Sequence, residues 1–206
     1  MLRSFFNSET GIWRFFGWVG DIVILSLLWV LCSIPVLTLG VASTALYDTI
    51  VHGMRRKEGN MFSRYFGTFR RELKTGCLTS LFWEACALFL FYLYSVLAGG
   101  RPDGQIAVVY SVIFLMILCF ILGILCWVFP LLSRFTFRFS DLNRTALRIS
   151  LGNILRSAAM SLLTFSAIAL FLRNYFSAFF TPGLVSWLCS YLIEPVFQSY
   201  ESKTSL

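Results

Sequence analysis

The chain has 206 residues, of which 58% are hydrophobic and only 13% are charged, and its mean hydropathy is +0.77. This composition excludes an ordinary soluble domain, because the apolar residues form blocks of about 20, the length that crosses a hydrocarbon core about 30 Å thick. The net charge of +7 requires no nucleic acid, since lysine and arginine gather between the apolar blocks, as they do in cytoplasmic loops. We therefore expect an all-α polytopic membrane protein whose residues 1–206 form a single domain.

The N-terminal part predicts an interfacial segment followed by a membrane span. Residues 1–16 are rich in aromatic side chains that favour the membrane surface. The first span is expected at 17–36. Pro35, Thr38 and Gly40 then predict a tight turn, in which Thr38 caps the next helix and Gly40 supplies unusual backbone angles. The small residues that follow favour close helix packing.

A short sixth helix at 41–54 leaves two topologies open. If it crosses the membrane, both termini are cytoplasmic and Arg3 and Arg14 join the positive side, as the charge rule favours. Its 14 residues include Asp48 and His52, so a crossing would need shielding by other helices or local thinning of the bilayer. If it does not cross, the chain has five spans and an external N-terminus. Both topologies place the C-terminus in the cytoplasm.

The rest of the chain alternates basic segments with further spans. Glycine, proline and aspartate in the connector 99–104 predict a tight return. The expected order is a basic amphipathic cytoplasmic segment at 55–74, spans at 75–98 and 106–132, a basic cytoplasmic segment at 133–156, a span at 157–172, and a last span within 175–193 that Pro182 and Gly183 interrupt.

Three polar residues form the candidate intramembrane site. Glu84 lies within the span at 75–98, where an unpaired carboxylate is costly and therefore indicates either a function or a hydrogen-bonded packing role. Asp48 and His52 are four residues apart and share a helical face, so they are expected to interact.

Aromatic and basic residues alternate at helical spacing along 62–74. This pattern predicts an amphipathic helix with an apolar stripe beside a cationic one. Such a helix either lies on anionic lipid or docks a partner. The candidate docking residues are Arg64, Arg70, Arg71 and Lys74.

The sequence offers no catalytic motif and no metal set. The nucleophile-elbow, Walker and HExxH patterns are absent. A single histidine and six scattered cysteines provide neither a zinc site nor a disulfide pattern. We therefore predict a non-enzymatic protein without catalytic residues, metal or cofactor.

Several blocks of the sequence resemble one family. The stretch "GDIVILSLLWVLCSIPVLTLGVASTALY" is similar to the signature of the YesL family of small bacterial integral membrane proteins, a domain of unknown function, through Pro35, Thr38, Gly40, Thr44 and Tyr47. The blocks "MFSRYFGTFRRELKTG" and "SYLIEPVFQSYE" also resemble the family, as does "FPLLSRF", which carries Phe129, Pro130, Arg134 and Phe135. Ser26 departs from the pattern, because family members often carry asparagine there.

The resemblance implies a role but no chemistry. It implies a multi-pass protein of the bacterial cytoplasmic membrane, acting as an accessory or regulatory partner of a carbohydrate ABC importer or of a sugar-responsive sensor kinase. The alternative is a small homo-oligomeric transporter in which Glu84, Asp48 and His52 line a polar route. In both cases the expected partners are the lipid bilayer and proteins, without nucleic acid.

Overall fold

The computed structural model of the chain describes residues 11–56, 59–99, 104–135 and 138–204, which contain helices and no strand. The elements in order are α1 (Gly11–Cys32), η2 (Val36–Thr38), α2 (Leu39–Asp48), η3 (Thr49–Arg55), α3 (Met61–Gly99), α4 (Gly104–Arg134), α5 (Phe139–Gly152), α6 (Ile154–Arg173), η4 (Tyr175–Phe179) and α7 (Thr181–Thr204). The predicted all-helical class is confirmed. Residues 1–10 of the expected interfacial segment and residues 100–103 of the expected tight return lie outside the described residues.

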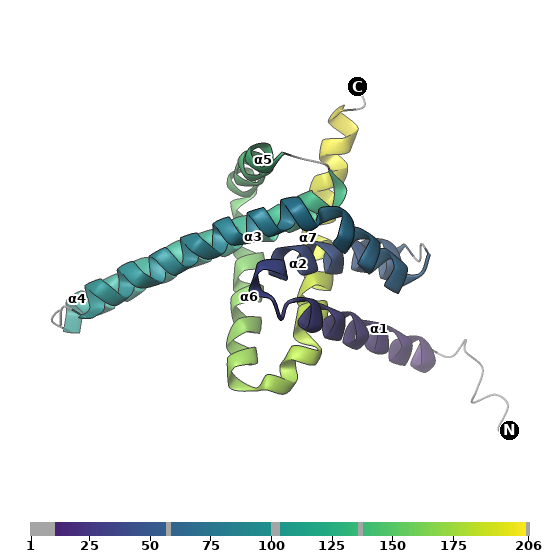
Figure 1. Cartoon of the computed structure of the whole chain (residues 1–206), viewed down its shortest axis with the longest axis horizontal. Coiled ribbons are helices and arrows are strands. Elements are labelled where there is room, and N and C mark those ends of the chain that lie inside the picture. Colours follow the sequence, from purple (N-terminus) through teal and green to yellow (C-terminus); the bar gives the residue numbers. More distant parts are fainter. Residues whose placement is uncertain (1–10, 57–58, 100–103, 136–137, 205–206) are drawn as a thin grey trace, which may run out of the picture.

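Helices α3 and α4 form a long antiparallel hairpin that extends away from the other helices (Figure 1). The 39 residues of α3 span about 58 Å at 1.5 Å per residue. We predicted a boundary between a basic segment at 55–74 and a span at 75–98, but α3 continues through it. Helical propensity and the absence of proline carry the helix across the change in polarity.

Three helical stretches are long and apolar enough to cross a membrane, namely Met61–Leu97, Ile106–Arg134 and Ile154–Arg173. The five predicted spans are therefore not confirmed. In α1 the described apolar stretch is Phe16–Cys32, and a turn follows Cys32. Helix α7 is not among the three, since serines and a glutamate dilute its apolar residues. The three stretches are compatible with a membrane protein.

The start of α7 corrects one prediction. Pro182 and Gly183 belong to the first turn of α7 rather than to an interruption, which suits proline because the first turn of a helix needs no N–H partner within the helix. The backbone N–H of Gly183 donates to the hydroxyl of Ser26 from α1 at 3.0 Å. Ser26 is fully buried and therefore joins α1 to the start of α7.

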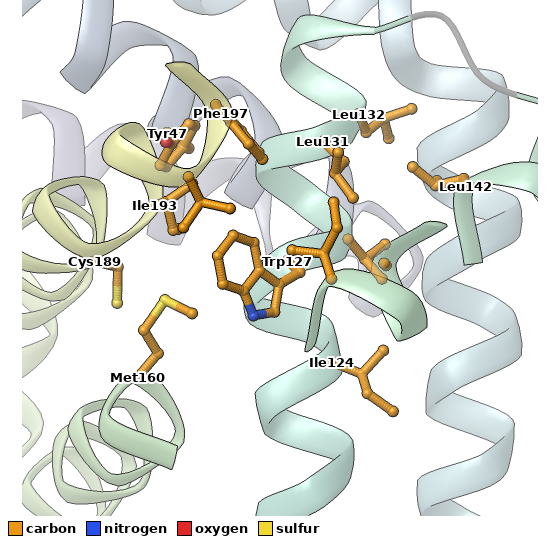
Figure 2. Close-up of a cluster of buried hydrophobic side chains, with 14 of the residues drawn as sticks. Tyr47, Ile124, Trp127, Leu131, Leu132, Leu142, Met160, Cys189, Ile193 and Phe197 are labelled. Atoms are coloured by element: carbon orange, nitrogen blue, oxygen red, sulfur yellow. The ribbon is translucent and has the colours of Figure 1, made fainter. Parts of the chain in front are cut away.

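The main apolar core lies where α4, α5, α6 and α7 meet, around Trp127. Figure 2 shows the indole of Trp127 surrounded by Met160, Ile193 and Phe197. Trp127 is fully buried and its ring N–H donates to Ser157 Oγ at 2.8 Å. The core is thus packed around one large side chain whose single polar atom has a partner.

Helix α2 packs directly against α3 through small residues. The N–H of Gly40 donates to Ser80 Oγ at 2.8 Å, and Gly76 of α3 approaches Val41. A Cβ at Gly40 would collide with Ser80 Oγ and lie 2.5 Å from the ring of Phe129. The close packing predicted for this run is present. The expected role of Gly40 was wrong in detail, because it is helical and provides space rather than a special backbone angle.

Candidate functional site

The candidate site begins where α2 changes into the π-helical turn η3. Asp48 ends α2, and the seven residues of η3 follow it without a break. The predicted short helix at 41–54 therefore exists, as two successive helical segments from Leu39 to Arg55. Segments with π-helical hydrogen bonds are rare and occur frequently at functional sites. Here the turn places His52 beside the carboxylate of Asp48.

Asp48 is nearly completely buried and contacts three polar side chains. Its Oδ2 accepts from Arg64 Nε at 3.0 Å and from Thr68 Oγ1 at 2.8 Å, both on α3. Its Oδ1 lies 3.0 Å from His52 Nδ1. A buried carboxylate is stable only with such charge-assisted partners. The predicted interaction of Asp48 with His52 is therefore present and belongs to a larger cluster.

A second buried carboxylate, that of Glu194, connects α7 to two other helices. Arg134 Nη2 at the end of α4 lies 2.6 Å from Glu194 Oε1 and 2.7 Å from Oε2. The hydroxyl of Tyr47 on α2 donates to Glu194 Oε1 at 3.2 Å. Burial, followed by the Glu194 carboxylate, raises the pKa of Tyr47 well above its usual value, so the hydroxyl remains a donor.

Two further arginines extend the cluster. Arg56 Nη2 lies 3.6 Å from Glu194 Oε2. Arg71 on α3 contacts the buried Glu72 through Nε at 2.7 Å and donates from Nη2 to the carbonyl of Ser133 at 3.3 Å. The side chains of Arg56 and Arg71 are 45% and 55% exposed, respectively. These two arginines therefore lie at the surface of the cluster.

Together these residues surround a polar pocket of about 310 Å³. It is lined by Asp48, His52, Arg56, Arg64, Arg71, Ser133 and Arg134. Carboxylates hold the guanidinium groups of Arg64 and Arg134 in place. The more exposed side chains of Arg56 and Arg71 lie at the mouth of the pocket. We refer to this pocket, defined by those seven residues, as the arginine pocket.

One part of the chain is similar to a known protein family. Residues 22–94 match the family described as "Protein of unknown function, DUF624". No curated protein and no solved structure matches the chain. This part of the chain is thus similar to an uncharacterised family.

The matched region contributes most of the arginine pocket. Asp48, His52, Arg56, Arg64 and Arg71 lie within the match to DUF624, whereas Ser133 and Arg134 lie outside it. The buried partner Glu194 also lies outside the match. The pocket is therefore assembled from the matched part and from the later helices α4 and α7.

The structure does not bring Glu84 to this site. Thr68, the α3 residue that donates to Asp48, is sixteen positions before Glu84, or about 24 Å along the helix axis. Within a single copy of the chain, the structure therefore brings Asp48 and His52 together but leaves Glu84 apart from them. Sequence reasoning grouped them by charge, although helical geometry separates them.

The predicted docking residues divide into two sets. Arg64 and Arg71 line the arginine pocket, whereas Arg70 and Lys74 are exposed and do not line it. Positions 70 and 71 differ by about 100° around a helix, so neighbours in sequence face different surroundings. Only Arg70 and Lys74 remain as an outward cationic face.

The residues of the family-like turn have structural contacts. Thr38 does not cap α2 with its side chain as we expected. Its hydroxyl lies 2.5 Å from the carbonyl oxygen of Cys32 and 2.7 Å from that of Pro35, so it closes the end of α1. Thr44 Oγ1 donates to the carbonyl of Gly40 at 2.8 Å.

The second family-like block ends in the same cluster. Phe129 contacts the region of Gly40, and the carbonyl of Pro130 accepts from Ser133 Oγ at 2.7 Å. The ring of Phe135 meets that of Phe197 edge-on, with centroids 6.4 Å apart. Arg134 is thus presented to Glu194 by a tightly packed helix end.

Sequence reasoning missed the roles of Glu72, Ser133 and Glu194. A signal for Glu194 was available, because a carboxylate in an otherwise apolar helix requires a cationic partner. Nothing in one sequence indicates that the partner is Arg134, sixty residues earlier. Among the described residues, no group of histidine, cysteine, aspartate and glutamate side chains could hold a metal ion.

An apolar cavity of about 450 Å³ lies next to Tyr47. It is lined mainly by α1, α2, α4, α6 and α7, and includes Trp29, Phe129 and Cys189. The ring of Tyr47 borders this cavity while its hydroxyl contacts Glu194. Tyr47 therefore borders the apolar cavity and is connected through Glu194 to Arg134 of the arginine pocket.

Proposed function

We propose that this chain is a non-enzymatic accessory or regulatory protein of the bacterial cytoplasmic membrane. In this proposal it works beside a carbohydrate importer or a sugar sensor. The observation that carries the proposal is the exposed cationic face of Arg70 and Lys74, at the basic end of a helix long enough to cross a membrane. Such a face suits contact with an acidic protein surface.

The link to carbohydrates comes from the resemblance to the YesL family. The match of residues 22–94 to a family of unknown function supports kinship with uncharacterised proteins. The YesL assignment is our finer proposal, and so is the cytoplasmic position of the C-terminus. Both follow from the motif residues and from the clustering of positive charge.

A non-catalytic role agrees with the contacts of the acidic side chains at the site. Asp48 and Glu194 each contact an arginine and a neutral donor, and Glu72 contacts Arg71. A general base needs a carboxylate that can reach a substrate proton. These carboxylates are instead occupied in holding guanidinium groups.

The test is a pull-down of the tagged protein from native membranes in mild detergent or nanodiscs, with mass spectrometry of the captured proteins. We expect a stoichiometric importer or sensor subunit with the wild-type chain, and its loss with Arg70→Ala combined with Lys74→Ala. The matched control is Arg144→Ala combined with Arg148→Ala, two exposed arginines of α5. Capture of the chain alone, or equal loss in the control, contradicts the proposal.

One observation favours a homo-oligomeric transporter as the second candidate. The far half of the α3–α4 hairpin exposes large apolar side chains that a second copy could cover. In that case Glu84 would act near a copy interface rather than with Asp48. Proton flux into liposomes that disappears in Glu84→Gln would support this candidate, and unchanged flux would remove Glu84 from it.

A further inference from the structure

The arginine pocket has the electrostatics of an anion site. Its lining contains four arginines and one aspartate, and the carboxylates of Glu72 and Glu194 lie against three of these arginines. Within the described part of the chain, four guanidinium groups and three carboxylates leave one positive charge when His52 is counted as neutral. A partly buried excess of positive charge attracts anions more strongly than the same charge in water.

The donors at the mouth are available to a ligand. A guanidinium group has five N–H donors. Arg71 contacts Glu72 through Nε and Ser133 through Nη2, and within the described part of the chain the side chain of Arg56 has only the 3.6 Å approach to Glu194. Both side chains are about half exposed, so the remaining N–H groups can reach a molecule in the pocket.

The floor of the pocket is held in place before any ligand arrives. Asp48 fixes Arg64, and Glu194 fixes Arg134, whose side chain is only 8% exposed. Guanidinium groups held in this way lose little conformational entropy on binding. The pocket is therefore preorganised by buried acids, of which Asp48 also lines the pocket whereas Glu194 does not.

The arrangement of donors indicates the shape of the anion. Arginines come from three directions, from the end of η3, from α3 and from the end of α4. A carboxylate presents two oxygens in one plane, whereas a phosphate group presents three or more acceptor oxygens around a tetrahedral centre. The volume of about 310 Å³ is within the range of small-molecule sites, about 300–1,000 Å³.

We propose that the arginine pocket binds a phosphate group, either of a soluble phosphate or of a lipid headgroup. Arg56 and Arg71 donate hydrogen bonds to its oxygens at the mouth of the pocket. Arg64 and Arg134 provide positive charge at the bottom of the pocket. This site goes beyond the accessory role proposed above and does not depend on it, since it requires neither a protein partner nor a carbohydrate.

The test is calorimetric titration of the full-length protein in phosphatidylcholine nanodiscs with inorganic phosphate, and with acetate as the planar anion. We expect saturable phosphate binding, at least tenfold weaker acetate binding, and a loss of about tenfold or more in phosphate affinity for Arg71→Gln. Arg70→Gln is the matched control, because it removes the same charge from the neighbouring exposed position. The thermal unfolding midpoint of each variant without phosphate shows that the fold is retained.

A second arm distinguishes the two sources of the phosphate group. In nanodiscs that contain phosphatidic acid, unchanged affinity for inorganic phosphate assigns the pocket to a soluble ligand. A reduced affinity, with co-purification of phosphatidic acid that Arg71→Gln abolishes, assigns it to a headgroup. The proposal is overturned if phosphate shows no saturable binding and phosphatidic acid is not retained, or if Arg70→Gln weakens binding as much as Arg71→Gln.

Discussion

The two halves of the α3–α4 hairpin have opposite surroundings. Near its base, Thr79 is fully buried, Ser80 bonds to α2, and Trp127 fills the main core. Toward the far end, Leu88 is 69% exposed and Met116 is 68% exposed, although both halves belong to the same two helices. Both halves belong to helices long enough to cross a membrane, but the contacts with the rest of the chain are at the base. The specific contacts of this protein are therefore concentrated at one end of the hairpin.

The largest loss of stability is expected from removing the buried carboxylate of Glu194 at the base. Glu194→Ala leaves Arg134 buried without its carboxylate, and breaking a buried pair in this way costs about 3–5 kcal/mol of unfolding free energy. Thermal or denaturant unfolding in detergent measures the loss. Combining Glu194→Ala with Arg134→Leu should recover part of the stability, because no uncompensated charge remains. A double variant that is as unstable as the sum of the two single variants contradicts this account.

A smaller loss is expected when α2 is forced away from α3. Gly40→Ala introduces a methyl group that meets Ser80 Oγ and the Phe129 ring, and such overpacking costs about 1–3 kcal/mol. Gly20→Ala is the control, since its Cβ would meet nothing within 4 Å. Equal unfolding midpoints for the two variants would refute the close contact of α2 with α3.

The hydrogen bond between α1 and α7 should contribute still less to the stability of the fold. Ser26→Ala removes the acceptor of the Gly183 N–H at the first turn of α7, a loss comparable to that of a helix cap, about 0.5–2 kcal/mol. Ser95→Ala, which affects only a bond within α3 to the carbonyl of Phe91, is the comparison. Faster hydrogen exchange confined to the start of α7 in Ser26→Ala is the expected signature. A uniform change along the chain would argue against a local link.

The smallest effect is expected at the far half of the hairpin. Leu88→Ala removes a side chain that contacts few protein atoms, and such exposed sites change stability by less than about 0.5 kcal/mol. Leu131→Ala at the base, where the side chain is 2% exposed, should cost about 2–5 kcal/mol. The two substitutions are chemically identical, so the ratio of their losses of unfolding free energy measures directly how differently the two halves of the hairpin are packed. A large loss for Leu88→Ala would show that something covers this face.

The sequence was sufficient for features that depend on local pattern. Hydropathy predicted the helical class, helical spacing predicted the contact of Asp48 with His52, and the small residues after Gly40 predicted close packing. It failed where the outcome depends on tertiary partners. The charge of Glu84 resembles that of Asp48, yet among the residues that the structure describes only Asp48 of the two contacts an arginine. The pairing of Glu194 with Arg134 joins two distant helices, and no periodicity within either helix encodes it.

The uninterrupted length of α3 has a mechanical consequence. Arg64 and Arg71 of the arginine pocket lie on the same continuous helix as the far end of the hairpin. The far end of α3 is about 58 Å from its first residue. A tilt of α3 by about 5° around its first residue displaces its far end by about 5 Å, a distance of the order of one helical turn. The helix thus acts as a lever arm that amplifies angular changes at its packed end into displacements at its exposed end.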